Sequence, residues 1–313
     1  MKLPLILPVL GYICLINTTI RVPNIPTYNI CGLSDEPGSS SDFMADRFEA
    51  YLAAHTHLKF PHRHSFFHLV YFSDVAGSHS IDFVDFDAKP GQIYFMNPGQ
   101  VHSWNFMGLP KGYIINFSEA FLQQFLSNTR YLDQFGFFNS LPEKQVVSIP
   151  AEKQPAILGI FQAILDESHL ADEFSQDKIR TLLLQLLYGV SRTVPKEKIT
   201  TLNNYNSLLF KNFQALIDQH FLSKKLVRDY AAMLYVTPNH LNALSKDVTG
   251  RSAGELIRDR ILLEAKRMLI NEHYNISEIA YSLNFEDNSY FTKFFKKYEG
   301  LTPQDFRKRA IAL

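Results

Sequence analysis

The sequence predicts an α+β chain with a β-rich N-terminal half, a pair of helices and an all-helical C-terminal domain. Residues 43–118 contain short aromatic and β-branched runs separated by Pro, Gly and Asp, which is typical of strands. From about residue 151 the apolar residues follow helical spacing instead. The last hundred residues contain an internal repeat with a period near 50, which indicates two similar helical units.

The composition is that of a globular protein. The chain has 313 residues, of which 46% are apolar and 20% charged, and its net charge is zero. These values exclude a disordered or fibrous chain, and the length is sufficient for two domains. Two cysteines, Cys14 and Cys31, cannot form a disulfide framework and lack zinc-finger spacing, so we expect a reducing, cytoplasmic compartment. Residues 207–313 carry 16 basic and 12 acidic side chains, which favours an anionic partner.

Changes of composition predict the boundaries. Residues 1–25 form a tail of uncertain status, because the apolar run at 3–16 is shorter than a membrane span of about 20 residues. We therefore expect no membrane association, with a signal peptide as the alternative. The predicted segments after it are a β domain (26–150), a helical pair (151–194), a polar linker (195–207) and an all-α domain (208–313).

The repeat predicts two helix-turn-helix units. Gly250-Arg251-Ser252-Ala253-Gly254-Glu255-Leu256 matches Gly300-Leu301-Thr302-Pro303-Gln304-Asp305-Phe306, fifty residues later. Each copy joins a helix stop at glycine to a new helix start at Ser or Thr. Upstream, Thr237 and Asp287 are the expected caps of the second helix of each unit.

Each second helix carries one polar stripe at helical spacing. Amides, hydroxyls and lysines suit the base edges and phosphates of a major groove. A helical bundle with a merely solvated face is the alternative, but two copies in phase favour double-stranded DNA. The stripe residues are Asn239, Asn242, Ala243 and Lys246 in the first unit, and Asn288, Ser289, Thr292, Lys293 and Lys296 in the second. We expect Asn239, Asn242, Thr292 and Lys293 at base edges, with Lys246 and Lys296 nearer phosphate.

One long helix is expected between the units. Residues 252–272 can form a helix of 21 residues, about 30 Å long at 1.5 Å per residue. That length is close to one DNA turn of about 34 Å, so both units could enter successive major grooves.

The last hundred residues resemble the AraC/XylS family of transcription regulators. The resemblance is most specific in residues 276–285, in 290–297 and in Gly300-Leu301-Thr302-Pro303. It implies a seven-helix domain, binding to promoter DNA and contact with RNA polymerase, and it favours an activator over a repressor. The chain departs from the family's turn glycine at Tyr235 and Asn284. Asparagine tolerates a positive φ, whereas a tyrosine in that conformation is costlier, so the sequence does not decide the exact turn of the first unit.

A second resemblance concerns histidines in the β domain. Strand parity places His62, His64 and His68 on one face, and His102 lies in a later segment. The two segments resemble the motifs of the cupin barrel, which serves as a sensor in AraC-type regulators. The resemblance implies an effector site, and a sugar is a chemically suitable guest. The expected ligand-binding residues are His62, His64, His68, Tyr94, His102, Trp104 and Tyr113.

Two alternatives remain open for the β domain and the helical pair. A cupin metalloenzyme or a metal-sensing regulator could use His62, His64, His68 and His102 to hold zinc, iron or copper. We favour a regulator that is not an enzyme and needs no cofactor. The helical pair is the candidate for a homodimer interface, although its leucines could instead pack on the barrel.

Overall fold

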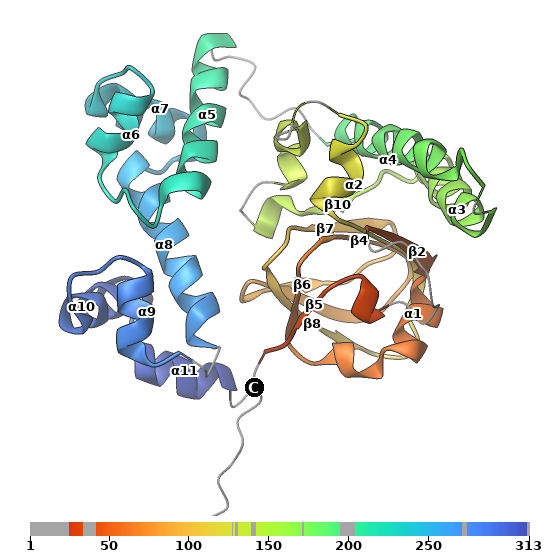
Figure 1. Cartoon of the computed structure of the whole chain (residues 1–313), viewed down its shortest axis with the longest axis horizontal. Helices are drawn as coiled ribbons and strands as arrows, with labels where there is room; N and C mark the ends of the chain where they lie inside the picture. The colour runs from red at the N-terminus through yellow and green to blue at the C-terminus, as the bar shows by residue number, and fades with distance from the viewer. Residues whose placement is uncertain are drawn as a thin grey trace, which may run out of the picture.

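The computed structural model describes residues 25–33, 42–126, 128, 131–138, 142–170, 172–194, 204–270 and 274–311 (Figure 1). The predicted tail up to residue 24, most of the predicted linker and Glu272 lie outside the described residues. Among the helices that are described, none combines the length and the apolarity needed to cross a lipid bilayer.

The N-terminal half contains two five-stranded sheets, which together form the β domain. The first sheet has the order β1-β3-β8-β5-β6 and the second β10-β7-β4-β9-β2. The prediction of an α+β chain is confirmed, and the barrel takes the form of these two sheets. The strands are β1 Thr27–Tyr28, β2 Phe43–Arg47, β3 His62–His64, β4 Phe67–Asp74, β5 Gly77–Ile81, β6 Val84–Asp87, β7 Gln92–Met96, β8 Val101–Phe106, β9 Lys111–Phe117 and β10 Val146–Ser148.

The second sheet is buried on both faces. In β4, Val70 and Phe72 belong to the core between the sheets, together with Trp104 of the first sheet. The intervening Leu69 and Tyr71 point to the opposite face and enter a different core. Because side chains alternate along a strand, burial on both faces explains why β4 is an almost unbroken apolar run.

Helices α3 (Gln154–Leu170) and α4 (Ser175–Ser191) cover the outer face of the second sheet (Figure 1). Their apolar residues share one core with that sheet, including Phe161 and Leu183. The short helix α2 (Glu119–Gln123) is tied to α4, since Arg180 Nε donates to the Phe121 carbonyl at 2.8 Å. The inward leucines of the helical pair therefore pack on the sheet, as the alternative interpretation held.

The described residues from 204 onward form seven helices, here called the helical domain, which surround a core of their own. Within it, α6–α7 and α9–α10 are the two helix-turn-helix units, and α8 runs between them (Figure 1). The helices are α5 Asn204–His220, α6 Val227–Met233, α7 Pro238–Thr249, α8 Ala253–Leu269, α9 Ile276–Ser282, α10 Asn288–Glu299 and α11 Pro303–Ile311.

The predicted caps are present in both units. The side chains of Thr237 and Asp287 each accept a hydrogen bond from the backbone amide three residues on, at 3.1 and 2.7 Å. Gly250 and Gly300 end α7 and α10 in the left-handed conformation, and Ser252 forms a capping box with Glu255. Local side-chain chemistry thus fixes where these helices begin and end.

Helix α8 is shorter than predicted. It begins after Ser252 as expected but ends at Leu269, so it has 17 residues and a length of about 25 Å. The expectation of 21 residues ending near Glu272 was wrong, because the apolar periodicity continues into Ile270, which already forms the C-cap.

Both turns adopt the left-handed backbone that the family's glycine would supply. Tyr235 has φ 56° and Asn284 has φ 55°. Tyrosine therefore accepts the conformation in the first unit, and its side chain is 96% exposed, so the turn itself and not side-chain packing places it there.

Candidate nucleic-acid interface and ligand site

The stripe of the first unit lies on α7. Asn239, Ala243 and Lys246 are exposed on this helix. Asn242 is half-buried, and its Oδ1 accepts a hydrogen bond from the Ala253 backbone amide at 3.1 Å. Asn242 thus joins α7 to the start of α8.

The stripe of the second unit lies on α10. Ser289, Lys293 and Lys296 are exposed, whereas Asn288 and Thr292 are half-buried and joined by a 3.3 Å hydrogen bond from Thr292 Oγ1 to Asn288 Oδ1. Both helix-turn-helix units lie on the side of α8 away from the β domain (Figure 1). The helices that carry the two stripes therefore lie away from the β domain.

Lys225 is a residue that the sequence interpretation missed. It precedes α6, yet its Nζ donates to the carbonyl of Asn284 and lies 3.7 Å from the centroid of the Phe285 ring. Burial lowers the pKa of Lys225 to about 8. The side chain joins the first unit to the turn of the second, and no local sequence pattern reveals a contact across 59 residues.

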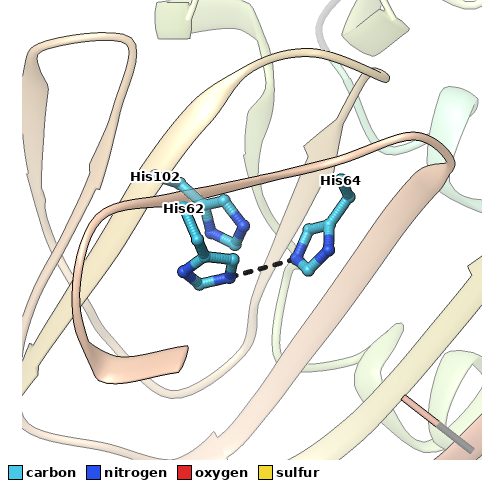
Figure 2. A group of neighbouring side chains, drawn as sticks. All are labelled: His62, His64 and His102. Atoms are coloured by element: carbon cyan, nitrogen blue, oxygen red, sulfur yellow. Dashed lines mark hydrogen bonds between the residues drawn. The ribbon is translucent and has the colours of Figure 1, made fainter. Parts of the chain in front are cut away.

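Histidines gather between the two sheets. His62 and His64 come from β3 and His102 from the neighbouring β8, as Figure 2 shows. His68 of β4 and His79 of β5 join them, with ring centroids of His64 and His68 4.6 Å apart and those of His79 and His102 5.5 Å apart. All five are buried. We call these five residues the histidine cluster.

Hydrogen bonds from the surroundings fix two of the rings. His62 Nδ1 donates to the carbonyl of Phe60 at 2.8 Å, and His68 Nδ1 donates to Asn116 Oδ1 at 2.6 Å. Each bond holds the proton on Nδ1, so each Nε2 carries a lone pair; that of His62 accepts a hydrogen bond from His64 Nε2, whereas that of His68 has no partner among the described residues. The Nε2 atoms of His62 and His64 then lie 3.2 Å apart.

Within the described part of the chain, four ring nitrogens of the histidine cluster have no hydrogen-bond partner. They are His64 Nδ1, His68 Nε2, His79 Nδ1 and His102 Nε2, and the Trp104 Nε1 beside them also lacks one. Burial lowers the pKa of His62 to about 4 and that of His68 to about 3. Burial and the neighbouring imidazoles also hold the pKa values of the other three histidines well below the ordinary range. The site is therefore a group of neutral imidazoles with unused donors and acceptors.

The structure brings most of the predicted ligand residues together. Tyr94 and Trp104 lie in the core between the sheets, with the Trp104 ring centroid 5.2 Å from that of His102. Tyr113 does not join them. It faces α3 on the opposite side of its sheet, where its hydroxyl donates to Gln162 Oε1 at 2.7 Å.

His79 is the member of the cluster that the sequence interpretation missed. It pairs directly with Trp104 across β5 and β8 and has the same parity as the buried Ile81. This alternation was the available signal. Tyr113, in contrast, was placed in the site because it is aromatic, although its strand has apolar residues on both faces.

A metal ion fits part of the cluster. One ligand nitrogen each from His62, His64 and His102 lie within 4.8 Å of one another. Bonds from zinc to imidazole nitrogen are about 2.0–2.1 Å long, so two tetrahedral ligands lie about 3.3 Å apart. The 3.2 Å between the Nε2 atoms of His62 and His64 matches this spacing. The carbonyl of Phe60 supplies the outer hydrogen bond that orients a metal-binding imidazole.

Comparison with known proteins gives two matches to family models. The AraC-like ligand-binding domain matches residues 46–187, and a helix-turn-helix domain matches residues 230–309. Among curated relatives, the transcriptional regulatory protein YesN of Bacillus subtilis is 40% identical over 79 residues, covering 25% of this chain and 22% of YesN. The HTH-type transcriptional activator RhaR of Yersinia pseudotuberculosis is 28% identical over 155 residues, covering 49% of this chain and 52% of RhaR. The chain thus spans about half or less of these relatives.

Solved structures also show similarity. ToxT from Vibrio cholerae is 12% identical, covers 86% of this chain and 98% of its own, and has a TM-score of 0.40. The C-terminal domain of the response regulator YesN from Fusobacterium nucleatum is 25% identical, covers 34% of this chain and 99% of its own, and has a TM-score of 0.31. On the two family models, which match the β domain with its helical pair and the helical domain in turn, the chain belongs to the AraC family of transcriptional regulators.

Proposed function

We propose that this protein binds promoter DNA sequence-specifically and that a small molecule in the β domain controls this binding. The observation that carries the proposal is the pair of capped helix-turn-helix units on α8, each with an exposed stripe of polar and basic side chains. Amides and hydroxyls suit base edges, and lysines suit phosphates. The matches to AraC-like ligand-binding and helix-turn-helix models support the same conclusion.

The test is selection of binding sites from a random DNA pool by the full-length chain, followed by mobility shifts on the enriched sequence. We expect selective binding that weakens with salt, because lysines displace counterions from phosphate. Lys293→Ala should relax selectivity at one position, at a cost of about 1–3 kcal/mol. Lys296→Ala should weaken binding to all sequences and lower the salt slope by about 1. No enrichment from the pool would refute the proposal.

The partners follow from this function. We propose that the chain acts in the cytoplasm as a homodimer, without a membrane, and that it activates transcription through RNA polymerase. The AraC family and the name of the relative RhaR, a transcriptional activator, support activation. The exposed faces of α3 and α4 remain available for the dimer, since their inward residues pack on the sheet. Sedimentation of the purified chain tests the dimer, and transcription from the selected site tests the sign of regulation.

The first candidate for the effector is a small polar organic molecule, such as a sugar, bound among the histidine cluster, Tyr94 and Trp104. The unused ring nitrogens supply both donors and acceptors, and the indole supplies an apolar face. Thermal-shift screening of sugars with the full chain tests this assignment. A true effector raises the melting temperature in wild type but not in His79→Ala, because that change removes one wall of the site.

A metal ion is the second candidate for the effector, and the spacing of the nitrogens favours it. Ring centroids of His62 and His102 are 4.2 Å apart, so a sugar would have to part the rings, whereas an ion fits between their nitrogens. The test titrates cobalt(II) into chelator-treated protein and follows its absorption. We expect one equivalent to bind in wild type and binding to be lost in His62→Ala and His102→Ala. The exposed His169→Ala is the control, and equal titrations in all variants would exclude this candidate.

A further inference from the structure

The β domain contacts the helical domain through the tip of one hairpin. Asp82 and Phe83 form the two-residue turn between β5 and β6, and both have positive φ values, 46° and 70°. Such turns ordinarily use Asn and Gly, because other side chains are strained there. Here both side chains meet the helical domain. Asp82 binds Arg267 of α8, and the ring centroid of Phe83 lies 5.6 Å from that of Phe306 in α11.

The ion pair at this contact is buried and bidentate. Arg267 Nε donates to Asp82 Oδ1 at 2.9 Å, and Arg267 Nη2 donates to Oδ2 at 2.6 Å. The carboxylate is fully buried, and the arginine side chain is 10% exposed. A planar guanidinium fork on a carboxylate fixes orientation as well as distance. The pair therefore sets how α8 lies on the β domain.

Groups of the β domain itself also donate hydrogen bonds to the Asp82 carboxylate. Gln100 Nε2 donates to Asp82 Oδ2 at 2.6 Å, and the Val101 amide donates to Oδ1 at 3.2 Å. Gln100 and Gln145 exchange two hydrogen bonds with each other, at 2.9 and 2.8 Å. The carboxylate thus has donors on both oxygens besides the arginine, and it cannot move without disturbing β8.

Strands β3 and β8 carry three members of the histidine cluster on their other face. In β3, Arg63 lies between His62 and His64, and its guanidinium donates to the carbonyl of Arg267. In β8, Val101 precedes His102 and packs in the core of the helical domain. Side chains alternate along a strand. Arg63 and Val101 therefore face the helical domain, while the histidines next to them in sequence face the interior between the sheets.

We propose that the Asp82–Arg267 pair is the latch that couples the histidine cluster to the DNA-binding units. The inference rests on the proposed function and adds the route of its regulation. A guest among the histidines displaces β3 and β8, and these strands carry Arg63, Val101 and the amide that holds Asp82. Helix α8 connects the two helix-turn-helix units, so a change in its seating changes how both are presented to DNA. The helix-turn-helix units lie on the side of α8 away from the β domain (Figure 1). The latch therefore does not cover the units, and it acts by changing the orientation of α8.

The test is hydrogen–deuterium exchange on the full-length chain, free and with the DNA selected above. In the free protein, Arg267→Met should raise exchange in peptides covering residues 77–87 by about tenfold or more, because the hairpin loses its anchor. In wild type, DNA should alter exchange in β3 and β8, since coupling between two sites is reciprocal. Arg267→Met should abolish that response while the DNA still protects α7 and α10.

Two further variants make the outcome decisive. Asp82→Asn breaks the pair from the other side with little change in shape and should reproduce the effect of Arg267→Met. Arg260→Met is the matched control on α8, because Arg260 binds Asp218, Glu264 and the Phe221 ring, all within the helical domain. If β3 and β8 respond to DNA equally in all four proteins, coupling does not use this latch. If wild type binds no DNA, the proposed function fails, while exchange of the free hairpin still tests the latch.

Discussion

At the scale of single residues, the β domain is unusual in placing five neutral imidazoles in one interior. Burial keeps the rings uncharged, and the Phe60 carbonyl and Asn116 hold His62 and His68 in the tautomer that carries its proton on Nδ1. Buried polar atoms are ordinarily hydrogen-bonded, so the four ring nitrogens that find no partner among the described residues indicate a site prepared for a guest. Burying these rings lowers the free energy of unfolding, and the size of this effect depends on pH.

Stability of the metal-free protein should fall in mild acid. The pKa values of His62 and His68 are about 4 and 3 in the folded state, against about 6.5 when unfolded. Below pH 6.5 the unfolded chain binds protons that the folded chain does not. The free energy of unfolding is therefore at its full value above pH 6.5 and falls as the pH is lowered toward 4. Each of these two residues lowers the free energy of unfolding by about 2 kcal/mol at pH 5.

Denaturant unfolding followed by the fluorescence of Trp104, the single tryptophan, measures this effect. His62→Gln should remove about 2 kcal/mol of the difference between pH 7.5 and pH 5. His169→Ala, at an exposed position, should leave the difference unchanged. A flat profile in wild type would contradict the assignment of buried neutral rings.

The turn of the first helix-turn-helix unit stores strain at one residue. Tyr235 has φ 56° and is 96% exposed, so its side chain gives little packing in return. A non-glycine residue in the left-handed region costs about 1–2 kcal/mol, of which glycine recovers part after its own entropy loss. We expect Tyr235→Gly to raise the free energy of unfolding by about 0.5–1 kcal/mol. Asn284→Gly should gain less, because asparagine tolerates this backbone, and equal gains at both turns would argue against strain at Tyr235.

At the scale of elements, strands β4 and β9 approach too closely for any side chain at Gly112. A Cβ there would lie 1.9 Å from the Tyr71 carbonyl oxygen, beside the register shift between Phe72 and Asp74. Gly112→Ala should therefore destabilise the β domain by about 3 kcal/mol or more, because backbone must move. Gly159→Ala in α3 meets nothing within 4 Å and should instead stabilise by about 1 kcal/mol. Chemical denaturation of both variants checks the contrast. A small loss in the free energy of unfolding for Gly112→Ala would mean that β4 and β9 can move apart at little energetic cost.

The elements also show what sequence reasoning could reach. Caps such as Thr237 and Asp287 act within four residues, so they were predictable and are confirmed. Strand parity was enough to place His62, His64 and His68 on one face, and His102 followed from the resemblance to the cupin motifs. Tyr113 was misjudged because β9 is apolar or aromatic on both faces, so parity alone does not say which face is the site. His79 was overlooked although the alternation of β5, in which it shares a buried face with Ile81, could have revealed it. The contacts of Lys225 and of Arg267 join residues 59 and 185 positions apart, beyond any local pattern.

At the scale of the whole molecule, α8 both separates the two helix-turn-helix units and contacts the β domain. Its two ends adjoin the helix-turn-helix units, and Arg267 near its C-terminal end meets the β domain. Lys225 adds a second tie between the units, at the turn of the second. With α8 continuous and the units tied to each other, the domain should present both reading helices to DNA at one fixed spacing.

That rigidity makes a prediction about the DNA site. Helix α8 is about 25 Å long and the units lie at its two ends, so one helical turn, roughly 34 Å, is the nearest spacing at which both can contact one face of the DNA. Inserting 5 base pairs between the two contacted segments turns one segment to the opposite face and should reduce affinity at least about tenfold, to that of one unit. Inserting 10 base pairs restores the face but not the distance, and because α8 cannot lengthen, affinity should remain low. The same insertions outside the site are the control in a mobility-shift titration. Full recovery with 10 base pairs would mean that the units are joined flexibly, and the orientation argument for the latch would then fail.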